Sequence, residues 1–170
     1  MKTEMIAVYV IVAALVIVPY IAIIVFGSGK GKKINKDFKN EVKSHALNIS
    51  KKESWNRHVI GVDKEKQQLI FTQHGEDSTV NTQIIDLNKV LAIDIFQKRN
   101  VVKENNKRNE FLDSLGLDFL MEHKERQTLR FYDTRVDVAQ NYEMEHAEKW
   151  RELLLDLKRS KDALKNTAAA

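Results

Sequence analysis

The chain has 170 residues, of which 43% are hydrophobic and 31% are charged, a composition typical of a folded domain with additional segments and unlike that of a disordered chain. Its formal net charge of +4 is too small to indicate nucleic-acid binding unless the positive charge is concentrated in one place. The absence of cysteine excludes disulfides, thiolate metal sites, cysteine nucleophiles and a lipoprotein anchor attached through cysteine.

The first element is an uncharged apolar run at residues 5–26, MIAVYVIVAALVIVPYIAIIVF. A helix of this length spans roughly 33 Å, slightly more than the hydrocarbon core of a bilayer at about 30 Å. Signal-peptide apolar regions are shorter, about 7–15 residues, and Val25-Phe26-Gly27 lacks the small-residue pattern of a cleavage site. We therefore predict that residues 1–29 form a transmembrane anchor that is retained.

Lysines around the apolar run predict its orientation. Before the run there is only Lys2. Four lysines follow it closely, namely Lys30, Lys32, Lys33 and Lys36. Because basic segments tend to stay on the cytoplasmic side, we predict a single-pass protein of the inner (plasma) membrane. Its N-terminus would lie outside and its C-terminal domain in the cytoplasm.

Residues 30–53 are predicted to be a basic juxtamembrane linker. Four apolar residues recur there at helical spacing, namely Phe38, Val42, Ala46 and Ile49. The amphipathic helix that this spacing indicates has two alternatives. It can lie on the inner leaflet with its lysines among anionic headgroups, or it can pack its apolar stripe on the following domain. The shortness of the stripe and its lack of tryptophan favour packing on the domain.

From Trp55 onward the apolar period changes from 3.6 to 2, which is typical of strands. The segments RHVIGVD and KQQLIFTQ flank the polar turn DKEK and predict a hairpin. Four more strands are predicted in TVNTQIIDL, KVLAIDIFQ, SLGLDFLME and QTLRFYD; in the second of these, Leu91, Ile93 and Ile95 alternate. The connections are too short for helical crossovers, so we predict an antiparallel meander of six strands with one buried face.

A basic segment, QKRNVVKENNKRNEF at residues 97–111, separates the fourth and fifth predicted strands. It is long for a hairpin connection, and long loops are commonly functional. Its five basic residues are Lys98, Arg99, Lys103, Lys107 and Arg108. We predict that they bind an anionic membrane surface or an acidic protein segment, with a plain solvated loop as the alternative. No aromatic residue lies in the basic centre, which argues against nucleic acid.

Residues 140–162, QNYEMEHAEKWRELLLDLKRSKD, predict one amphipathic helix. Its apolar stripe consists of Ala147, Trp150, Leu154 and Leu157. Acidic residues in the first turn and basic residues near the end agree with the helix dipole. A lone helix with such a stripe needs a surface to cover, so we predict that it covers the sheet with Trp150 as a structural core residue. Residues 163–170 are predicted to be a disordered tail.

The order of these elements resembles a pleckstrin-homology-like domain at residues 54–162. The resemblance is carried by WNRHVIGVDKEKQQLIF, IIDLNKVLAIDIF and the helix tryptophan in AEKWRELL. It implies an α+β fold, an antiparallel β-barrel or meander of seven strands in two near-orthogonal sheets, capped by a C-terminal helix. The seventh strand would lie near residues 100–103 or 136–138. The run LNISKKESWNRHVIGVDKEKQQLIF is similar to uncharacterised membrane-anchored proteins of Bacteroidetes-type bacteria.

Motifs for ligands and catalysis are absent from the sequence. Family members that bind inositol phosphates share K-x(n)-[KR]-x-R across the first hairpin. This chain has Arg57, His58, Lys64 and Lys66 there but no following arginine, so phosphoinositide binding is not implied. Glu143 and His146 have the spacing of a di-metal ligand pair, but such sites need two pairs and further glutamates. We therefore expect no enzyme activity, no cofactor and no metal site.

The sequence predicts a membrane-anchored, non-catalytic interaction module. In this hypothesis the anchor holds the domain at the membrane and presents it to the cytoplasm, where it binds a protein partner or the anionic membrane surface. The alternative is a small accessory or regulatory subunit of a membrane complex that acts through its transmembrane helix. Small residues in the apolar run permit the close helix packing that this alternative needs.

Overall fold

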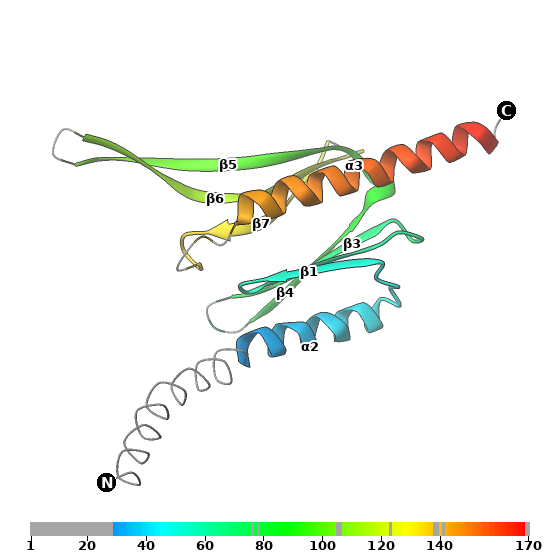
Figure 1. The fold of residues 1–170 in the computed structure, drawn as a ribbon, viewed down its shortest axis with the longest axis horizontal. Helices are drawn as coiled ribbons and strands as arrows, with labels where there is room; N and C mark the ends of the chain where they lie inside the picture. The colour runs from blue at the N-terminus through cyan, green and yellow to red at the C-terminus, as the bar shows by residue number, and fades with distance from the viewer. Residues whose placement is uncertain are drawn as a thin grey trace, which may run out of the picture.

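The computed structural model describes residues 29–75, 77, 79–104, 107–122, 124–137, 140 and 142–168. The predicted transmembrane run at residues 5–26 lies outside this part of the chain. Among the described helices, none has both the length and the apolar character needed to cross a membrane. Figure 1 shows the described elements, which in chain order are α2 (Gly29–Ser44), β1 (Lys51–Trp55), β2 (His58–Asp63), β3 (Gln68–His74), β4 (Val80–Asp86), the 3-10 helix η1 (Leu87–Lys89), β5 (Val90–Glu104), β6 (Lys107–Met121), β7 (Arg126–Asp133) and α3 (Glu143–Ala168).

The described strands form two antiparallel sheets. The first contains β1, β2, β3 and β4 in that order, and the second contains β5, β6 and β7. The predicted hairpin is confirmed as β2 and β3. Asp63 shapes its turn, because its Oδ1 atom accepts hydrogen bonds from the backbone N–H groups of Glu65 and Lys66 at 3.0 and 2.9 Å. Together with the C-terminal helix, the two sheets confirm the predicted α+β class.

Strand β1 is the strand that the six-strand prediction lacked, and it brings the number of described strands to seven. The two positions predicted for this additional strand were wrong. The prediction places residues 51–53 in the linker, whereas they pair with β2 in a register that ends at Trp55↔His58. Residues 100–103 instead lie within β5, and residues 136 and 137 belong to the connection after β7. In β1 only Trp55 is buried, so backbone pairing makes this strand without the apolar alternation that sequence patterns detect.

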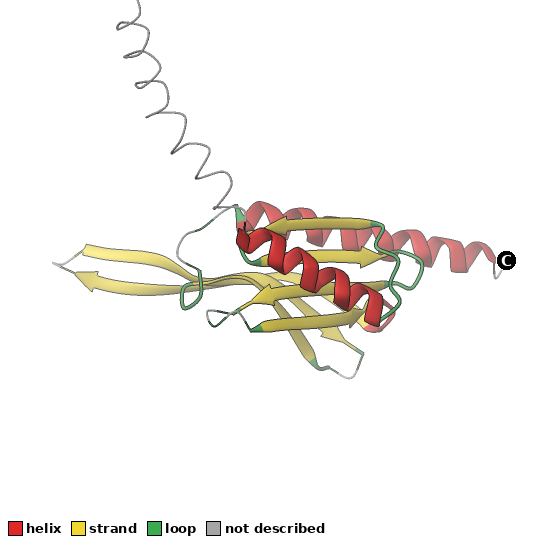
Figure 2. Ribbon diagram, turned by 90° about the horizontal axis from the view of Figure 1, so that it is seen from below, coloured by secondary structure: helices red, strands yellow, loops and turns green. Residues whose placement is uncertain are grey.

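Helix α2 packs on the outer face of the first sheet, as Figure 2 shows from below. Ile34 and Phe38 are 1% and 2% exposed and join Val59 and Ile70 in a small core. Gly61 makes room for the helix, because a Cβ atom at this position would lie only 2.8 Å from the Phe38 ring. Packing on the domain is therefore the alternative that the described part of the helix adopts.

One prediction about the linker and one about the sheet were wrong. The helix ends at Ser44, so Ala46 and Ile49 of the predicted stripe lie beyond it. The first sheet is also covered on both faces, not on the single face that we predict for a meander. This explains why β2 reads as an uninterrupted buried strand, since its alternate residues face α2 and the main core.

The main core lies between the two sheets and α3. Along β6 the predicted alternation is confirmed, because Leu115, Leu117 and Phe119 are fully buried. Along α3 the predicted stripe is confirmed at Trp150 and Leu154, which are 1% and 0% exposed. The helix thus closes the space between the sheets, and Trp150 is a structural core residue as predicted.

Two predictions about the second sheet and its helix were wrong. Leu91 is 56% exposed, because the register shifts between Val90 and Ala92 and a bulge turns Leu91 away from the core. Helix α3 continues to Ala168, past residue 163 where we predict a disordered tail. Residues 169 and 170 lie outside the described part of the chain.

Candidate interaction surface

The outer halves of β5 and β6 form a two-stranded projection, which we call the ribbon (residues 99–104 and 107–112). Figures 1 and 2 show that it extends beyond the rest of the described molecule. Strand β7 pairs with β6 only between Ser114 and Leu120, so the ribbon has no third strand. Its register runs without a shift from Arg99↔Leu112 to Glu104↔Lys107. The prediction of a loop at residues 97–111 was therefore wrong.

The ribbon extends a ladder that begins in the core. Beyond the register shift between Lys98 and Arg99, every second residue pair adds hydrogen bonds, so the strands continue past the point where burial ends. Val101 and Val102 favour extended backbone because they are β-branched. In the sequence, Asn105-Asn106 places two turn-forming residues between the two runs. That spacing is a local signal for a turn, but it does not show how far the two strands pair.

Charged side chains at the base and along the ribbon are largely exposed. Lys98, Arg99 and Arg108 have exposed side-chain fractions of 67%, 59% and 67%. Lys98 pairs with Asp113 at 3.0 Å, whereas the two arginines share Glu110 at 3.9 and 3.6 Å. Exposed ion pairs contribute only about 0–1 kcal/mol, so these cations remain available to another anion.

Apolar side chains accompany this charge. Phe111 is 53% exposed and Val101 is 43% exposed. Opposite residues of an antiparallel pair share a face, so Val101 lies on the face of Glu110 and Phe111 lies on the other face. Lys103 and Lys107 occupy the last two register positions at the outer end. All five basic residues that we predict for this segment thus lie in the ribbon or at its base.

The four lysines predicted near the membrane belong to α2, on a different layer from the ribbon. Lys33 and Lys36 are exposed, and Lys30 and Lys32 lie in the first turn of the helix. Figures 1 and 2 both show that the N-terminal end of α2 and the free end of the ribbon point toward the same end of the long axis of the molecule. The two basic groups are therefore separate, but they face the same end of the molecule.

A polar cavity of about 300 Å³ lies beside the ends of β3 and β7. Its lining includes His58, His74, Asp133 and Asp137, each no more than 8% exposed. Sequence reasoning missed this group, because no motif spacing links residues on strands so far apart. Beside the cavity, Arg57 links the end of β3 to the connection after β7, because it donates to the backbone carbonyls of His74 at 3.2 Å and Val136 at 3.1 Å.

The ionisable groups of this cavity have shifted pKa values. Burial lowers the pKa of His58 to about 4, helped by the charge of Arg57, so its ring is neutral at pH 7. The Arg135 guanidinium lowers the pKa of Asp133, to which it donates at 2.9 and 2.7 Å. Burial raises the pKa of Asp137, whose Oδ2 atom accepts from the backbone N–H of Asp133 at 3.0 Å. Most of these contacts hold the connection after β7, so we interpret the cavity as structural.

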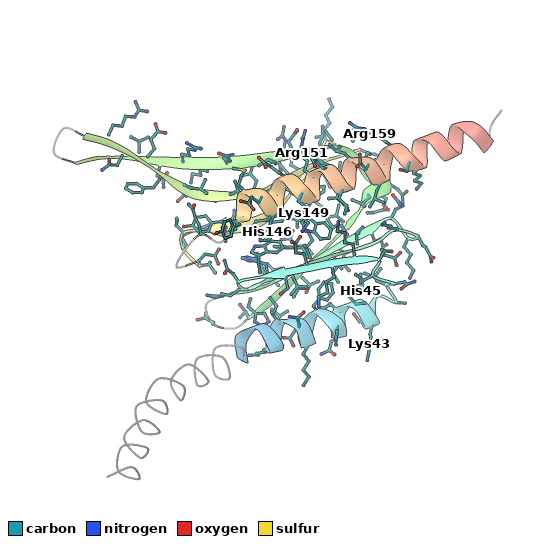
Figure 3. All side chains as sticks on the ribbon, in the orientation of Figure 1. Lys43, His45, His146, Lys149, Arg151 and Arg159 are labelled. Carbon is teal, nitrogen blue, oxygen red and sulfur yellow. The ribbon has the colours of Figure 1, made fainter. Side chains whose placement is uncertain are left out.

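The carboxylate of Glu53 fastens β1 to α3. It accepts hydrogen bonds from Trp150 Nε1 and from Lys149 Nζ, each at 2.6 Å, and His146 Nδ1 lies 3.3 Å away. Figure 3 shows Lys149 and His146 on the α3 side of this contact. The indole of Trp150 is therefore both packed in the core and held at its polar edge.

Metal binding finds no support in the described residues. Glu143 accepts from Asn56 at 2.9 Å while His146 turns to Glu53, so the two residues with di-metal spacing point to different partners. Among the described side chains, no group of three or more histidines and carboxylates could hold a metal ion.

Comparison with protein-family models, with curated proteins and with solved structures finds no match to the chain.

Proposed function

We propose that the protein is a membrane-anchored, non-catalytic interaction module whose binding element is the ribbon. The observation that carries the proposal is a basic two-stranded projection that has no third strand beside it and packs against the main core at its base, through Leu112. An isolated two-stranded hairpin is only marginally stable in water. Exposed Phe111 and Val101 add apolar area of the kind found at contact sites. A partner that covers the ribbon would supply the missing contacts.

The anchoring part of the proposal is supported by the apolar run at residues 5–26 and the lysines that follow it. They favour an inner-membrane protein with its C-terminal domain in the cytoplasm. A pleckstrin-homology-like fold is supported by the seven described strands, divided four and three, and by the C-terminal helix with buried Trp150. This fold serves as a scaffold from which the ribbon projects.

The proposal is tested by contact mapping in membranes that contain the full-length protein. A photoreactive residue replaces Val101 on the ribbon or, as a matched control, Leu91 on the same strand. Both positions are exposed and apolar. We expect an adduct, with lipid or protein, from position 101 but not from position 91. Equal adducts from both positions would contradict the ribbon as the binding element.

A shortened protein separates the proposed function from its alternative. Residues 99–113 are replaced by Asn-Gly between Lys98 and Ser114, which pair with each other in the native sheet, so the register of the inner ladder is kept. We expect this protein to fold and to resist alkaline extraction from membranes, but to lose the contacts of the ribbon. If its partners are retained and are lost only when residues 5–26 are exchanged for another apolar helix, the accessory-subunit alternative is favoured. Extraction of the intact protein by alkali would contradict the anchor.

A further inference from the structure

We propose that the ribbon binds the anionic surface of the same bilayer that anchors the protein. Negatively charged lipid headgroups would contact its arginines and lysines, with Val101 and Phe111 at the level of the headgroups. This inference rests on the proposed function, because it requires residues 5–26 to lie in the membrane.

The position of the ribbon relative to α2 carries the first step. Helix α2 begins at Gly29, three residues after Phe26 ends the apolar run. At no more than about 3.5 Å per residue, its first residue lies within roughly 10 Å of the end of that run. The ribbon points toward the same end of the molecule as this terminus (Figures 1 and 2). Six residues per strand at about 3.4 Å give it a reach of roughly 20 Å beyond the core.

The charge of the ribbon selects the partner. From Lys98 to Asp113 the hairpin carries five basic residues and three acidic ones, and Glu110 is shared by two arginines. A second copy of the chain would bring like charges together along the free strand edge, which disfavours self-pairing. The negative surface potential of an anionic leaflet attracts basic residues that lie close to it. The tether also keeps the lipid surface at a high effective concentration.

The apolar residues of the ribbon fit the same surface. Val101 shares a face with the arginine pair around Glu110, and Phe111 lies on the opposite face one pair closer to the core. An end-on approach therefore brings cationic and apolar groups to the bilayer together. Arginine suits this boundary because its apolar stem can lie among the lipids while its guanidinium stays in water, and the apolar side chains of Phe111 and Val101 can enter the boundary between headgroups and acyl chains.

The experiment uses the full-length protein, which lacks cysteine and therefore accepts a single fluorescent label. The label is attached at Val101→Cys or, as the control, at Leu91→Cys, which is 56% exposed in the native protein and lies roughly 30 Å back along β5. The proteins are reconstituted in vesicles of phosphatidylcholine, alone or mixed with phosphatidylglycerol. Lipids with a nitroxide headgroup quench a label that reaches the surface.

We expect quenching at position 101 in the anionic vesicles, at least twice that at position 91, and its loss in about 1 M salt, where the Debye length is about 3 Å. A ribbon variant with Arg99, Lys103, Lys107 and Arg108 changed to glutamine should fall to the level of position 91. A control variant with glutamine at Lys64, Lys89, Lys124 and Arg159 should keep the full quenching, because these residues lie outside the ribbon.

Equal quenching at the two positions, in protein that resists alkaline extraction, would overturn the lipid inference and leave the anchor intact. Failure to insert into phosphatidylcholine vesicles would instead contradict the proposed function. A label at position 101 that responds to added polyglutamate but not to anionic lipid would assign the ribbon to an acidic protein, and this too would overturn the inference.

Discussion

The inner and outer halves of the β5–β6 hairpin share one ladder but differ in burial. In the inner half Phe119 is fully buried, whereas Phe111, eight residues earlier on the same strand, is 53% exposed. The difference arises from the neighbours, since β7, the first sheet and α3 cover the inner half, and of the ribbon Leu112 at its base packs against the main core. The hairpin shows that backbone pairing can carry a strand beyond the core, and that stability and binding can then be separated along its length.

The largest expected effect compares the loss of one phenylalanine ring in the inner half of the hairpin with the loss of another in the ribbon. Phe119→Ala should lower the free energy of unfolding by about 3–5 kcal/mol, because it removes a buried ring and leaves a cavity. Phe111→Ala should change it by no more than about 0.5 kcal/mol. Urea denaturation followed by circular dichroism measures both variants. Similar losses would mean that the ribbon belongs to the cooperative core.

A second effect is the pH dependence of the free energy of unfolding, and it arises at the buried His58, away from the ribbon. The unfolded chain protonates His58 near pH 6.5, whereas burial delays protonation in the folded protein to about pH 4. The stability that depends on neutral His58 is therefore present above pH 6.5 and is lost as the pH falls through this window. The loss amounts to about 3 kcal/mol.

His58→Phe tests this pH effect, because it keeps an aromatic ring beside Trp55 and Phe71 but cannot be protonated. Denaturation at several pH values should show a smaller loss between pH 6.5 and pH 4 than in the native protein. His45→Gln is the control, since His45 is exposed near the end of α2. The same pH dependence in native protein and in His58→Phe would refute the role of His58.

A third comparison contrasts two carboxylates. Glu53→Ala should cost about 1–3 kcal/mol, because it leaves the buried Nε1 atom of Trp150 without its acceptor. Glu110→Ala removes two exposed ion pairs of the ribbon and should cost less than about 0.5 kcal/mol. Thermal unfolding at low and high salt measures both. A greater loss for Glu110→Ala would show that charge pairs stabilise the ribbon.

The smallest expected effect is on binding and follows from the proposed lipid contact. Glu110→Gln removes the acid that the two ribbon arginines share, so it should strengthen binding to anionic vesicles by about 1 kcal/mol, or about fivefold. The salt concentration that abolishes quenching at position 101 should rise. Glu148→Gln, an exposed acid on α3, should leave it unchanged. An unaltered salt midpoint for Glu110→Gln would argue against headgroup contact.

Local periodicity by itself determined the α+β class, the β2–β3 hairpin, the buried row of β6 that includes Leu117, and the α3 stripe around Trp150. In each of these elements a repeat of 2 or 3.6 residues matches the spacing at which side chains return to one face, and that spacing is a property of the backbone.

Only the tertiary structure decided that β1 is a strand, that the basic loop is a ribbon, that α2 covers the first sheet and that His58 borders a polar cavity. Strand β1 and the ribbon have mostly exposed side chains, so hydrogen bonds to a partner strand define them. Helix α2 and the cavity depend on residues distant in sequence, such as Phe38 beside Gly61 and Arg57 beside Val136. Contacts of this kind leave no periodic trace in the chain, because each element supplies only half of the interaction.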